Sequence, residues 1–434
     1  MKPQTLTRGF VGVDIPNDDV ITNCMHCGLC LPTCPTYSLT GQEKSSPRGR
    51  IRLIKSVAEG KLPMTQGFID EMNFCLDCQA CETACPAGVH YGSLVEAARN
   101  QIRIQHKQSL SERILKKIFL KNVLANPKKL KFVARMLWLY QHSGIESLIR
   151  FFGIARLLTP KLAKLQELSP RVDHKFFDIQ FPEIVSPKGR VQYKVGFLSG
   201  CIMNVAFSKI HEDTIKVLLH HGCEVIIPKS QVCCGSLQAH NGDFDTAREL
   251  AKKNIDVFSK YNLDAIVINS AGCSAMMKEY GHYLQHDPEY AEKAHKISAK
   301  VKDVSEFLYS IGLRKPEREF SHTVTYHDAC HLVHSQGISK QPRELLKSIP
   351  GIRYVELNEA SWCCGSAGIY NIVRYDNSMK ILERKIKNIS DTRAEYIVAN
   401  NPGCILQIQY GCQHDGNNAK VIHLATLLTK AYGI

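Results

Sequence analysis

The spacing of apolar residues along the chain changes near residue 190. Between residues 101 and 172, apolar side chains such as Phe132, Met136 and Tyr140 recur at intervals of four, which predicts amphipathic helices. The dipeptides Asn126-Pro127 and Thr159-Pro160 divide this stretch into pieces. Beyond residue 190, short apolar runs alternate with amphipathic segments, which predicts strands that alternate with helices.

The predicted strands and helices of the second part follow an order that recurs. We expect strands at residues 191–199, 224–228, 265–270, 323–327, 353–357, 396–400 and 421–422. We expect helices at residues 205–221, 245–261, 274–284 and 376–389. Strands that alternate with helices form parallel sheets covered on both faces, so this part is predicted to contain two α/β units of one kind.

The amino-acid composition excludes some classes of protein. The chain has no apolar run of about eighteen residues and no apolar segment near Met1, so we expect neither a membrane span nor export. Eighteen cysteines in a chain that is not exported indicate metal chemistry in a reducing compartment. We therefore expect a cytoplasmic protein.

Positive charge is concentrated in residues 101–171. This stretch carries fifteen Lys or Arg residues against Glu112, Glu146 and Glu167, in a chain of net charge +14. Such a surface attracts acidic proteins or anionic lipid, although a solvated helix face has the same composition. Nucleic acid is disfavoured because no binding motif is present. We expect a helical connector that docks a partner, with peripheral association at the inner face of the cell membrane as a further expectation.

Eight cysteines near the N-terminus form two copies of the spacing C-x2-C-x2-C-x3-C-P, which is typical of ferredoxins with two 4Fe–4S clusters. In such ferredoxins the fourth cysteine of each motif ligates the other cluster. Zinc sites ordinarily use pairs of cysteines, and disulfides between residues three apart are strained, so both are disfavoured. We expect one cluster on Cys24, Cys27, Cys30 and Cys85, and the other on Cys75, Cys78, Cys81 and Cys34.

Two further expectations concern the residues around these motifs. Arg48 and Arg50 precede a predicted helix at residues 51–57, and they either lie near an anionic cluster and raise its reduction potential or are surface arginines. After the second motif, Ser93 followed by Glu96 predicts a helix that is capped by Ser93.

A second set of cysteines occurs twice in the C-terminal part, each time as a single cysteine, a Cys-Cys-Gly triplet and another single cysteine. The two intervals are 31 and 37 residues in the first copy, and 32 and 38 residues in the second. Each cysteine follows shortly after a predicted strand, where ligands converge in open α/β sheets. The residues are Cys201, Cys233, Cys234 and Cys273 in the first copy, and Cys330, Cys363, Cys364 and Cys404 in the second.

The chemistry of these repeated cysteines is left open by the sequence. They are additional cluster or metal ligands, redox-active thiols, or inert buried cysteines. His327 and His331 flank Cys330 and are proton donors, alternative ligands or structural histidines. Cys223 and Cys412 lie outside the repeat and are expected to be buried as small apolar residues.

These features together predict an α+β and α/β multidomain protein. We expect an α-helical ferredoxin-type domain with two clusters at residues 1–100 and a basic helical connector at residues 101–190. Two repeated α/β domains with parallel sheets, each built around a Cys-Cys-Gly triplet, follow at residues 191–315 and 316–434.

The chain resembles the iron–sulfur subunit of glycolate oxidase, a glycolate dehydrogenase. The resemblance covers nearly the whole chain and rests on the paired ferredoxin motifs, the stretch Ser46-Pro47-Arg48-Gly49-Arg50-Ile51 and the two Cys-Cys-Gly repeats. Segments such as Ser270-Ala271-Gly272-Cys273 and Trp362-Cys363-Cys364-Gly365-Ser366 are similar too. A related architecture occurs in lactate-utilisation proteins, in a glycerol-3-phosphate dehydrogenase subunit and in heterodisulfide reductase.

The resemblance implies an electron-transfer subunit of an oxidoreductase complex, without full catalytic competence alone. A partner subunit that binds FAD would oxidise the 2-hydroxy acid, and two 4Fe–4S clusters would carry electrons to a quinone or another acceptor. The chain has no dinucleotide fingerprint, so we expect no flavin or NAD on it. Lactate or glycerol-3-phosphate oxidation is the alternative substrate class.

Two other classes of function remain open. One is direct catalysis at the Cys-Cys-Gly sites, as in heterodisulfide reductase, whose repeats end in C-x-x-C and hold a non-cubane cluster. Here Cys273 and Cys404 have no cysteine three residues later, so the fifth ligand is missing in both copies. The other class is a regulatory cluster sensor whose basic segment binds nucleic acid or membrane.

Overall fold

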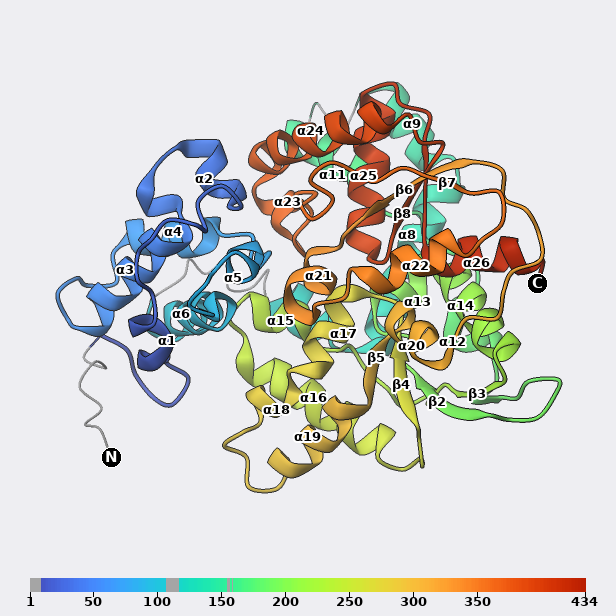
Figure 1. Cartoon of the computed structure of the whole chain (residues 1–434). Helices are drawn as coiled ribbons and strands as arrows, with labels where there is room; N and C mark the ends of the chain where they lie inside the picture. The colour runs from blue at the N-terminus through green and yellow to red at the C-terminus, as the bar shows by residue number, and fades with distance from the viewer. Residues whose placement is uncertain (1–8, 107–116, 154–156, 158) are drawn as a thin grey trace.

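The computed structural model describes residues 9–106, 117–153, 157 and 159–434. The part of the predicted connector helix at residues 107–116 lies outside these residues. Figure 1 shows a helical N-terminal domain beside a larger body that contains the two sheets. Among the helices described, none has the length and apolar content needed to cross a membrane.

The N-terminal domain is helical and has its own apolar core. Ile54, Phe68, Met72 and Leu94 are almost completely buried in this core. Its elements are α1 (Asp18–Thr22), α2 (Pro35–Thr40), η1 (Glu43–Ser45), α3 (Pro47–Ala58), α4 (Gln66–Phe74), α5 (Ala80–Thr83) and α6 (Tyr91–Gln105).

The predicted cap of helix α6 is wrong. The helix begins at Tyr91, two residues before Ser93, whose hydroxyl donates to the His90 carbonyl at 2.8 Å instead of accepting from the helix. The reason is that Glu82 accepts from the Gly92 N–H at 2.6 Å, so a carboxylate from a preceding turn satisfies the first exposed donor.

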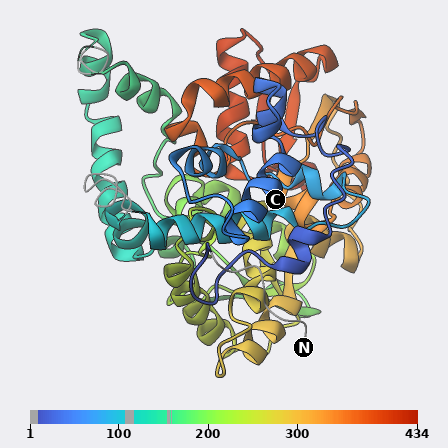
Figure 2. The same cartoon turned by 90° about the vertical axis from the view of Figure 1, so that its left-hand side faces the viewer.

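The connector consists of short helices that leave apolar side chains in solvent. They are η2 (Lys117–Leu124), α8 (Pro127–His142), α9 (Ile145–Phe151), α11 (Pro160–Leu168) and α12 (Phe177–Gln180). In Figure 2 the teal part of this segment stands at the edge of the molecule. Phe132, Met136 and Phe151 are exposed, Phe151 to 83%, so the predicted apolar stripe is not a core face here.

The first repeat contains a five-stranded sheet in the order β1-β3-β2-β4-β5. The strands are β1 (Ile184–Val185), β2 (Tyr193–Phe197), β3 (Cys223–Ile226), β4 (Ala265–Ile268) and β5 (Val301–Asp303). Four strands are parallel, and β1 pairs antiparallel to β3, which departs from the predicted all-parallel sheet. The helices are α13 (Ile202–Ala206), α14 (Ser208–His220), α15 (Ser236–His240), α16 (Phe244–Phe258), α17 (Ala271–Lys278), α18 (Tyr280–Tyr283), α19 (Ala291–Lys300) and α20 (Val304–Ile311).

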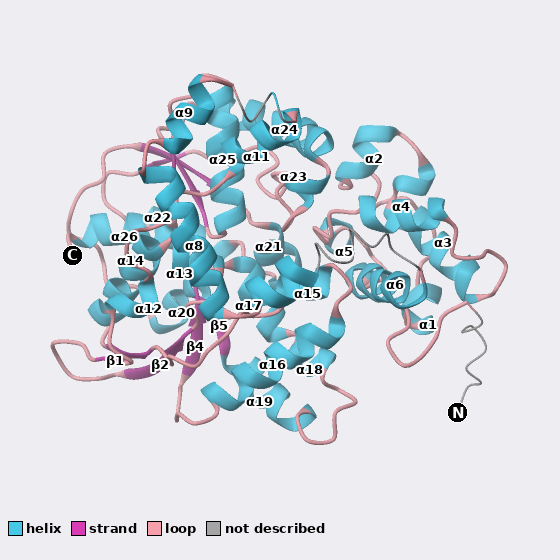
Figure 3. Cartoon of the chain, turned by 180° about the vertical axis from the view of Figure 1, so that it is seen from behind, coloured by secondary structure: helices cyan, strands magenta, loops and turns pink. Residues whose placement is uncertain are grey.

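The second repeat has a parallel sheet in the order β7-β6-β8-β9, which is the order β3-β2-β4-β5 of the first repeat. The strands are β6 (Thr323–His327), β7 (Arg353–Tyr354), β8 (Tyr396–Ala399) and β9 (Lys420–Ile422). The helices are α21 (Cys330–Gln336), α22 (Lys340–Lys347), α23 (Tyr370–Val373), α24 (Tyr375–Thr392), α25 (Pro402–His414) and α26 (Leu424–Tyr432). In Figure 3, helices surround the strands of these sheets.

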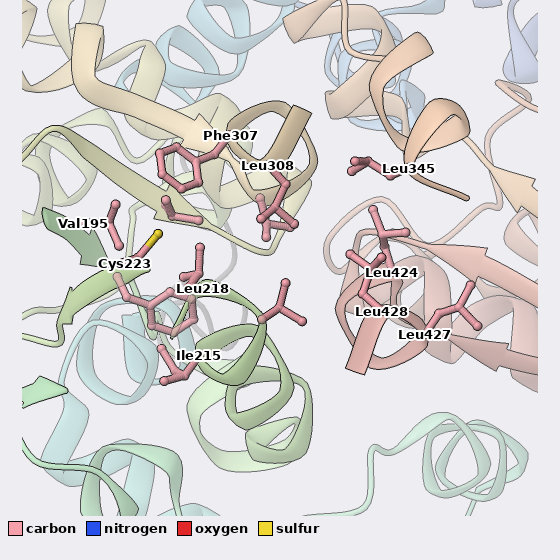
Figure 4. Close-up of a cluster of buried hydrophobic side chains, with 14 of the residues drawn as sticks. Val195, Ile215, Leu218, Cys223, Phe307, Leu308, Leu345, Leu424, Leu427 and Leu428 are labelled. Atoms are coloured by element: carbon pink, nitrogen blue, oxygen red, sulfur yellow. The ribbon is translucent and has the colours of Figure 1, made fainter. Parts of the chain in front are cut away.

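The two repeats share one apolar core. Figure 4 shows Leu218 and Leu308 of the first repeat facing Leu345 and Leu424 of the second. Helix α14 packs on α26, and α20 packs on α22. Burial of these side chains in one cluster makes the two repeats a single packed body, which holds their cysteine sites in a fixed relation to each other.

Candidate metal centres

The two N-terminal cysteine loops adopt the same backbone course. In each loop, the residue two positions after the first cysteine has a positive φ, 56° at His26 and 57° at Asp77. The residue two further on is also left-handed, at Gly28 and Gln79. Left-handed backbone is costly for residues other than glycine, so its recurrence at matching positions indicates loops shaped to aim several thiols inward.

Each loop lines one cavity, which is also lined by one or two cysteines of the opposite motif. The first cavity is lined by Cys24, Cys27 and Cys30 of the first motif and by Cys81 and Cys85 of the second. The second cavity is lined by Cys75, Cys78 and Cys81 of the second motif and by Cys34 of the first. Each predicted set of four thiols thus lines one cavity.

The residues present fit two iron–sulfur clusters. All eighteen cysteines of the chain are free thiols, so none of these eight is used in a disulfide. In two-cluster ferredoxins, each cluster is held by three thiols from one loop and a fourth from the other. Apolar residues such as Ile51, Val89 and Leu76 complete the walls and restrict water, which is one way in which proteins tune such centres.

Arg48 and Arg50 each line one of the two cavities. Arg48 lines the first, donates to the His26 carbonyl at 2.8 Å and pairs with Glu43. Arg50 lines the second and is fully buried, with a donation to the Glu71 carbonyl at 2.8 Å. Burial lowers the pKa of Arg50, but nearby groups, Tyr91 first, raise it by more, so this guanidinium stays charged.

A network of charged residues joins the N-terminal domain to both repeats. The carboxyl of Asp77 lies 3.3 Å from Nδ1 of His240, which also pairs with Glu96. Burial lowers the pKa of His240, but Glu96 and Asp77 raise it to about 10, so His240 is protonated. Burial lowers the pKa of His331, which is therefore neutral and donates to the Asp77 carbonyl at 2.9 Å. Sequence spacing gives no sign of this network, because its members are far apart in the chain.

The four repeated cysteines come together in the first repeat. The Sγ atoms of Cys201 and Cys233 lie 3.5 Å apart, and Cys234 contacts both Cys233 and Cys273. They border the apolar cluster of α16 and α17. The predicted convergence of each set at the carboxyl ends of the strands is thus present in the structure, and Cys223 and Cys412 are buried as predicted.

In the second repeat the same order of contacts runs from Cys330 through Cys363 and Cys364 to Cys404, and its two ends have different surroundings. Cys330 and Cys363 belong to an apolar cluster that also contains Leu76 and Cys78 of the N-terminal domain. Cys364 and Cys404 point into the core of the second repeat. Helix α21, which begins at Cys330, packs on α5 of the N-terminal domain. The second repeat therefore places two thiols directly beside the second N-terminal cavity.

Comparison with protein families agrees with this architecture. Residues 20–89 match the 4Fe-4S dicluster domain, and residues 195–278 and 324–409 each match the cysteine-rich domain. Residues 111–169 match the linker region of the glycolate oxidase iron–sulfur subunit. The chain therefore carries an iron–sulfur domain, the linker and two cysteine-rich repeats.

Several characterised or named proteins are similar along the chain. A probable glycolate oxidase iron–sulfur subunit of Bacillus subtilis (strain 168) is 40% identical over 95% of this chain and 94% of its own length. The glycolate oxidase iron–sulfur subunit of Escherichia coli (strain K12) is 30% identical over 89% of each chain. Lactate utilization protein A of Oceanobacillus iheyensis is 31% identical over 54% of this chain and 96% of its own length.

Proposed function

The chain belongs to the family of glycolate oxidase iron–sulfur subunits, and we propose that it is the electron-transfer subunit of a complex that oxidises a 2-hydroxy acid, glycolate first. A flavin-bearing partner subunit would oxidise the substrate, and a quinone or a comparable acceptor would take the electrons. The observation that carries this proposal is the pair of cavities, each lined by three cysteines of one motif and by at least one cysteine of the other.

The ligand sets that we propose are those that line the cavities. Cys24, Cys27, Cys30 and Cys85 hold one cluster, and Cys75, Cys78, Cys81 and Cys34 hold the other. A bound 4Fe–4S cluster supplies one-electron redox chemistry at a potential that its surroundings set. Around the sites, apolar walls exclude water, and the guanidinium groups of Arg48 and Arg50 offset negative charge.

The two cavities differ in how far they are exposed, and this difference indicates where electrons would enter from the partner. The loop of the first cavity exposes Met25 to 68% and Leu29 to 57%, and Cys27 is exposed as well. The second cavity is covered by the second repeat. Exposed large apolar residues beside a redox site favour contact with another protein, so we propose that the flavin-bearing partner docks on this loop.

A lactate-oxidising complex is the second candidate. It is favoured by the similarity to lactate utilization protein A, which covers 54% of this chain. The similarity to glycolate oxidase subunits covers 89% or more, which is why glycolate comes first. The substrate pocket would lie on the partner in either case.

The proposal is tested by anaerobic purification with the co-purifying partner, followed by iron and flavin counts and EPR of the reduced sample. We expect about eight irons per chain from two cubane clusters, with flavin only on the partner. The variants Cys34→Ser and Cys85→Ser form a matched pair, each expected to remove the cluster of the opposite motif. Loss of the cluster of the variant's own motif would contradict the ligand sets, and flavin on this chain would contradict the division of labour.

The same preparation tests the docking surface. The double variant Met25→Ser/Leu29→Ser is expected to keep its iron and EPR signals and to lose at least tenfold in flavin-to-cluster electron transfer. The double variant Phe132→Ser/Phe151→Ser, on the exposed connector, is the comparison, and a loss confined to it would place the partner on the connector instead.

A further inference from the structure

The two cysteine-rich repeats can be aligned residue by residue from their packing. A Cβ atom placed on Gly235 would lie 3.3 Å from the carbonyl oxygen of Ala247, and one placed on Gly365 would lie 2.6 Å from that of Ser378. Each triplet glycine therefore faces the same point on the following long helix. This register between α16 and α24 makes Asn254 and Lys385 equivalent, since each lies seven residues further along its helix.

The two repeats differ at the strand end that leads to the first cysteine. Leu198 lies three residues before Cys201, and His327 lies three residues before Cys330. Both side chains are buried, Leu198 in the apolar cluster of its repeat and His327 with no exposed surface. The second repeat therefore places an imidazole where the first has only hydrocarbon.

The His327 imidazole lacks the partners that a structural histidine would have. Among the residues that the structure describes, neither ring nitrogen makes a hydrogen bond of good geometry, although the Ala360 backbone lies close to the ring. The nearby Ala360 carbonyl already accepts from the Asp328 N–H at 3.1 Å and from the Lys385 amine at 3.0 Å. A neutral imidazole has a lone pair on one ring nitrogen, and this is the atom with which histidine binds metal ions. A buried polar group without a hydrogen-bond partner lowers the stability of the folded state unless a bound group takes the place of that partner.

Two thiols converge on this ring. A ring nitrogen of His327 and the Sγ atoms of Cys364 and Cys404 all lie within 4.8 Å of one another. Tetrahedral coordination, with metal–sulfur bonds of about 2.3 Å and metal–nitrogen bonds of about 2.0 Å, separates such atoms by roughly 3.4–3.8 Å. A movement of about 1 Å by these side chains would bring the nitrogen and both sulfur atoms to bonding distance of one metal ion. The four cysteines of the first repeat belong to no such group among the residues described.

The surroundings suit a thiolate-bound cation. The side-chain amide of Asn401 donates to Cys404 Sγ at 3.6 Å, which is the kind of contact that orients a ligand. Lys385 is fully buried and lies close enough to Cys330, Cys364 and Cys363 for its charge to interact with theirs. It therefore offsets part of the negative charge that two thiolates bring, whereas its counterpart Asn254 is neutral.

We propose that the second repeat binds a single thiophilic divalent ion of the zinc class through His327, Cys364 and Cys404, and that the first repeat has no equivalent site. Three protein ligands of this type are the number found in zinc sites that keep a fourth position for a non-protein ligand. Cys330 and Cys363, which face the second N-terminal cavity, remain outside this site. The two repeats have therefore diverged in chemistry although they share a fold.

The test uses the full chain, purified anaerobically from medium that contains zinc, with metal counts by mass spectrometry and X-ray absorption at the zinc edge. We expect about one zinc per chain in a mixed nitrogen and sulfur environment. The variant His327→Leu copies the residue of the first repeat and is expected to lower zinc at least tenfold without changing iron. Cys273→Ser removes the first-repeat counterpart of Cys404 and is expected to leave zinc unchanged.

A second variant separates loss of a ligand from loss of the fold. His327→Cys supplies a different ligand at the same position and is expected to retain zinc, with an absorption spectrum in which a third sulfur replaces the histidine nitrogen. Absence of zinc from the wild-type chain would overturn the proposal. Equal zinc in His327→Leu, equal loss in Cys273→Ser, or loss of iron in place of zinc would also overturn it.

Discussion

The imidazole rings of His240 and His331 meet edge to face with their centroids 4.8 Å apart. His240 belongs to the first repeat and His331 to the second, and both contact Asp77 in the second cysteine loop of the N-terminal domain. One residue of the ferredoxin-type domain thus lies at the meeting point of all three units, with its carboxylate on His240 and its backbone carbonyl on His331. The position of this domain on the two repeats is consequently fixed beside its second cavity.

The glycine that follows His240 by two residues tests this junction. A Cβ atom on Gly242 would lie 2.5 Å from the backbone of Arg99. The guanidinium of Arg99 donates to the His240 carbonyl at 2.9 Å. Gly242→Ala should therefore separate the N-terminal domain from the first repeat and lower the free energy of unfolding by about 2–4 kcal/mol. Urea unfolding and the rate of proteolytic release of the N-terminal domain would measure this.

A second glycine provides the control. Gly416 has φ 69°, close to the 75° of Gly242, but a Cβ atom there would meet nothing within 4 Å. Gly416→Ala should show the backbone cost alone, about 1 kcal/mol, without faster release of the domain. Equal effects of the two substitutions would show that contact with Arg99 does not hold the junction together.

Arg50 is expected to raise the reduction potential of the second centre. A buried charge about 8 Å from a redox group contributes about 2 kcal/mol at an effective dielectric constant near 20, or roughly 90 mV for one electron. Arg50→Gln should lower that potential by this order in an EPR-monitored titration. Arg48→Gln should act less strongly and on the first centre, because Arg48 is partly exposed whereas Arg50 is fully buried, although each is paired with a glutamate. Unchanged potentials in Arg50→Gln would contradict the assignment.

Asp303 should make stability depend on pH. It caps helix α20 from a fully buried position, and burial raises its pKa from 3.8 to about 6. Because the folded state binds this proton more tightly, its contribution to stability is full below about pH 4 and is lost as the pH rises through 6. The loss is at most about 3 kcal/mol.

The variant Asp303→Asn separates this contribution from other titrating groups. Asparagine also caps helices well, so the bond to the Ser305 N–H at 2.8 Å can persist without the buried charge. Urea unfolding of the variant should vary less than the wild type between pH 4 and pH 6.5. Parallel pH profiles for the two proteins would contradict the expected titration.

Much of the fold could be predicted because buried parallel strands leave a plain signal. The apolar or β-branched run at Thr323–His327 is strand β6, and Tyr396–Ala399 falls within the expected strand at residues 396–400. Strand β1 escaped prediction because two residues carry no periodicity, and its antiparallel pairing depends on where the connector meets β3. The cap of α6 was missed because its partner, Glu82, comes from another turn.

In the candidate sites, too, the features that depend on residues close in sequence could be predicted, and those that depend on the packing of distant segments could not. Cysteine spacing is local, so the sequence alone yields the two proposed ligand sets, and these stay a prediction although the members of each set line one cavity. Among the described residues, the burial of His327 and the lack of a well-formed hydrogen bond to its ring depend on how the Ala360 loop and α24 pack around it, and residue spacing does not record that packing. The pairing of Asp77 with His240 likewise depends on how two domains pack, and it became visible only in the structure.

The contacts between the two repeats are symmetric. Helix α14 of the first repeat corresponds by position to α22 of the second, and α20 corresponds to α26. The observed contacts, α14 with α26 and α20 with α22, are therefore the same contact made twice with the roles exchanged. Such reciprocity is the mark of an isologous two-fold interface. The two repeats are therefore related as the two subunits of a symmetric homodimer would be, and the counterpart of the dimer interface lies inside a single chain.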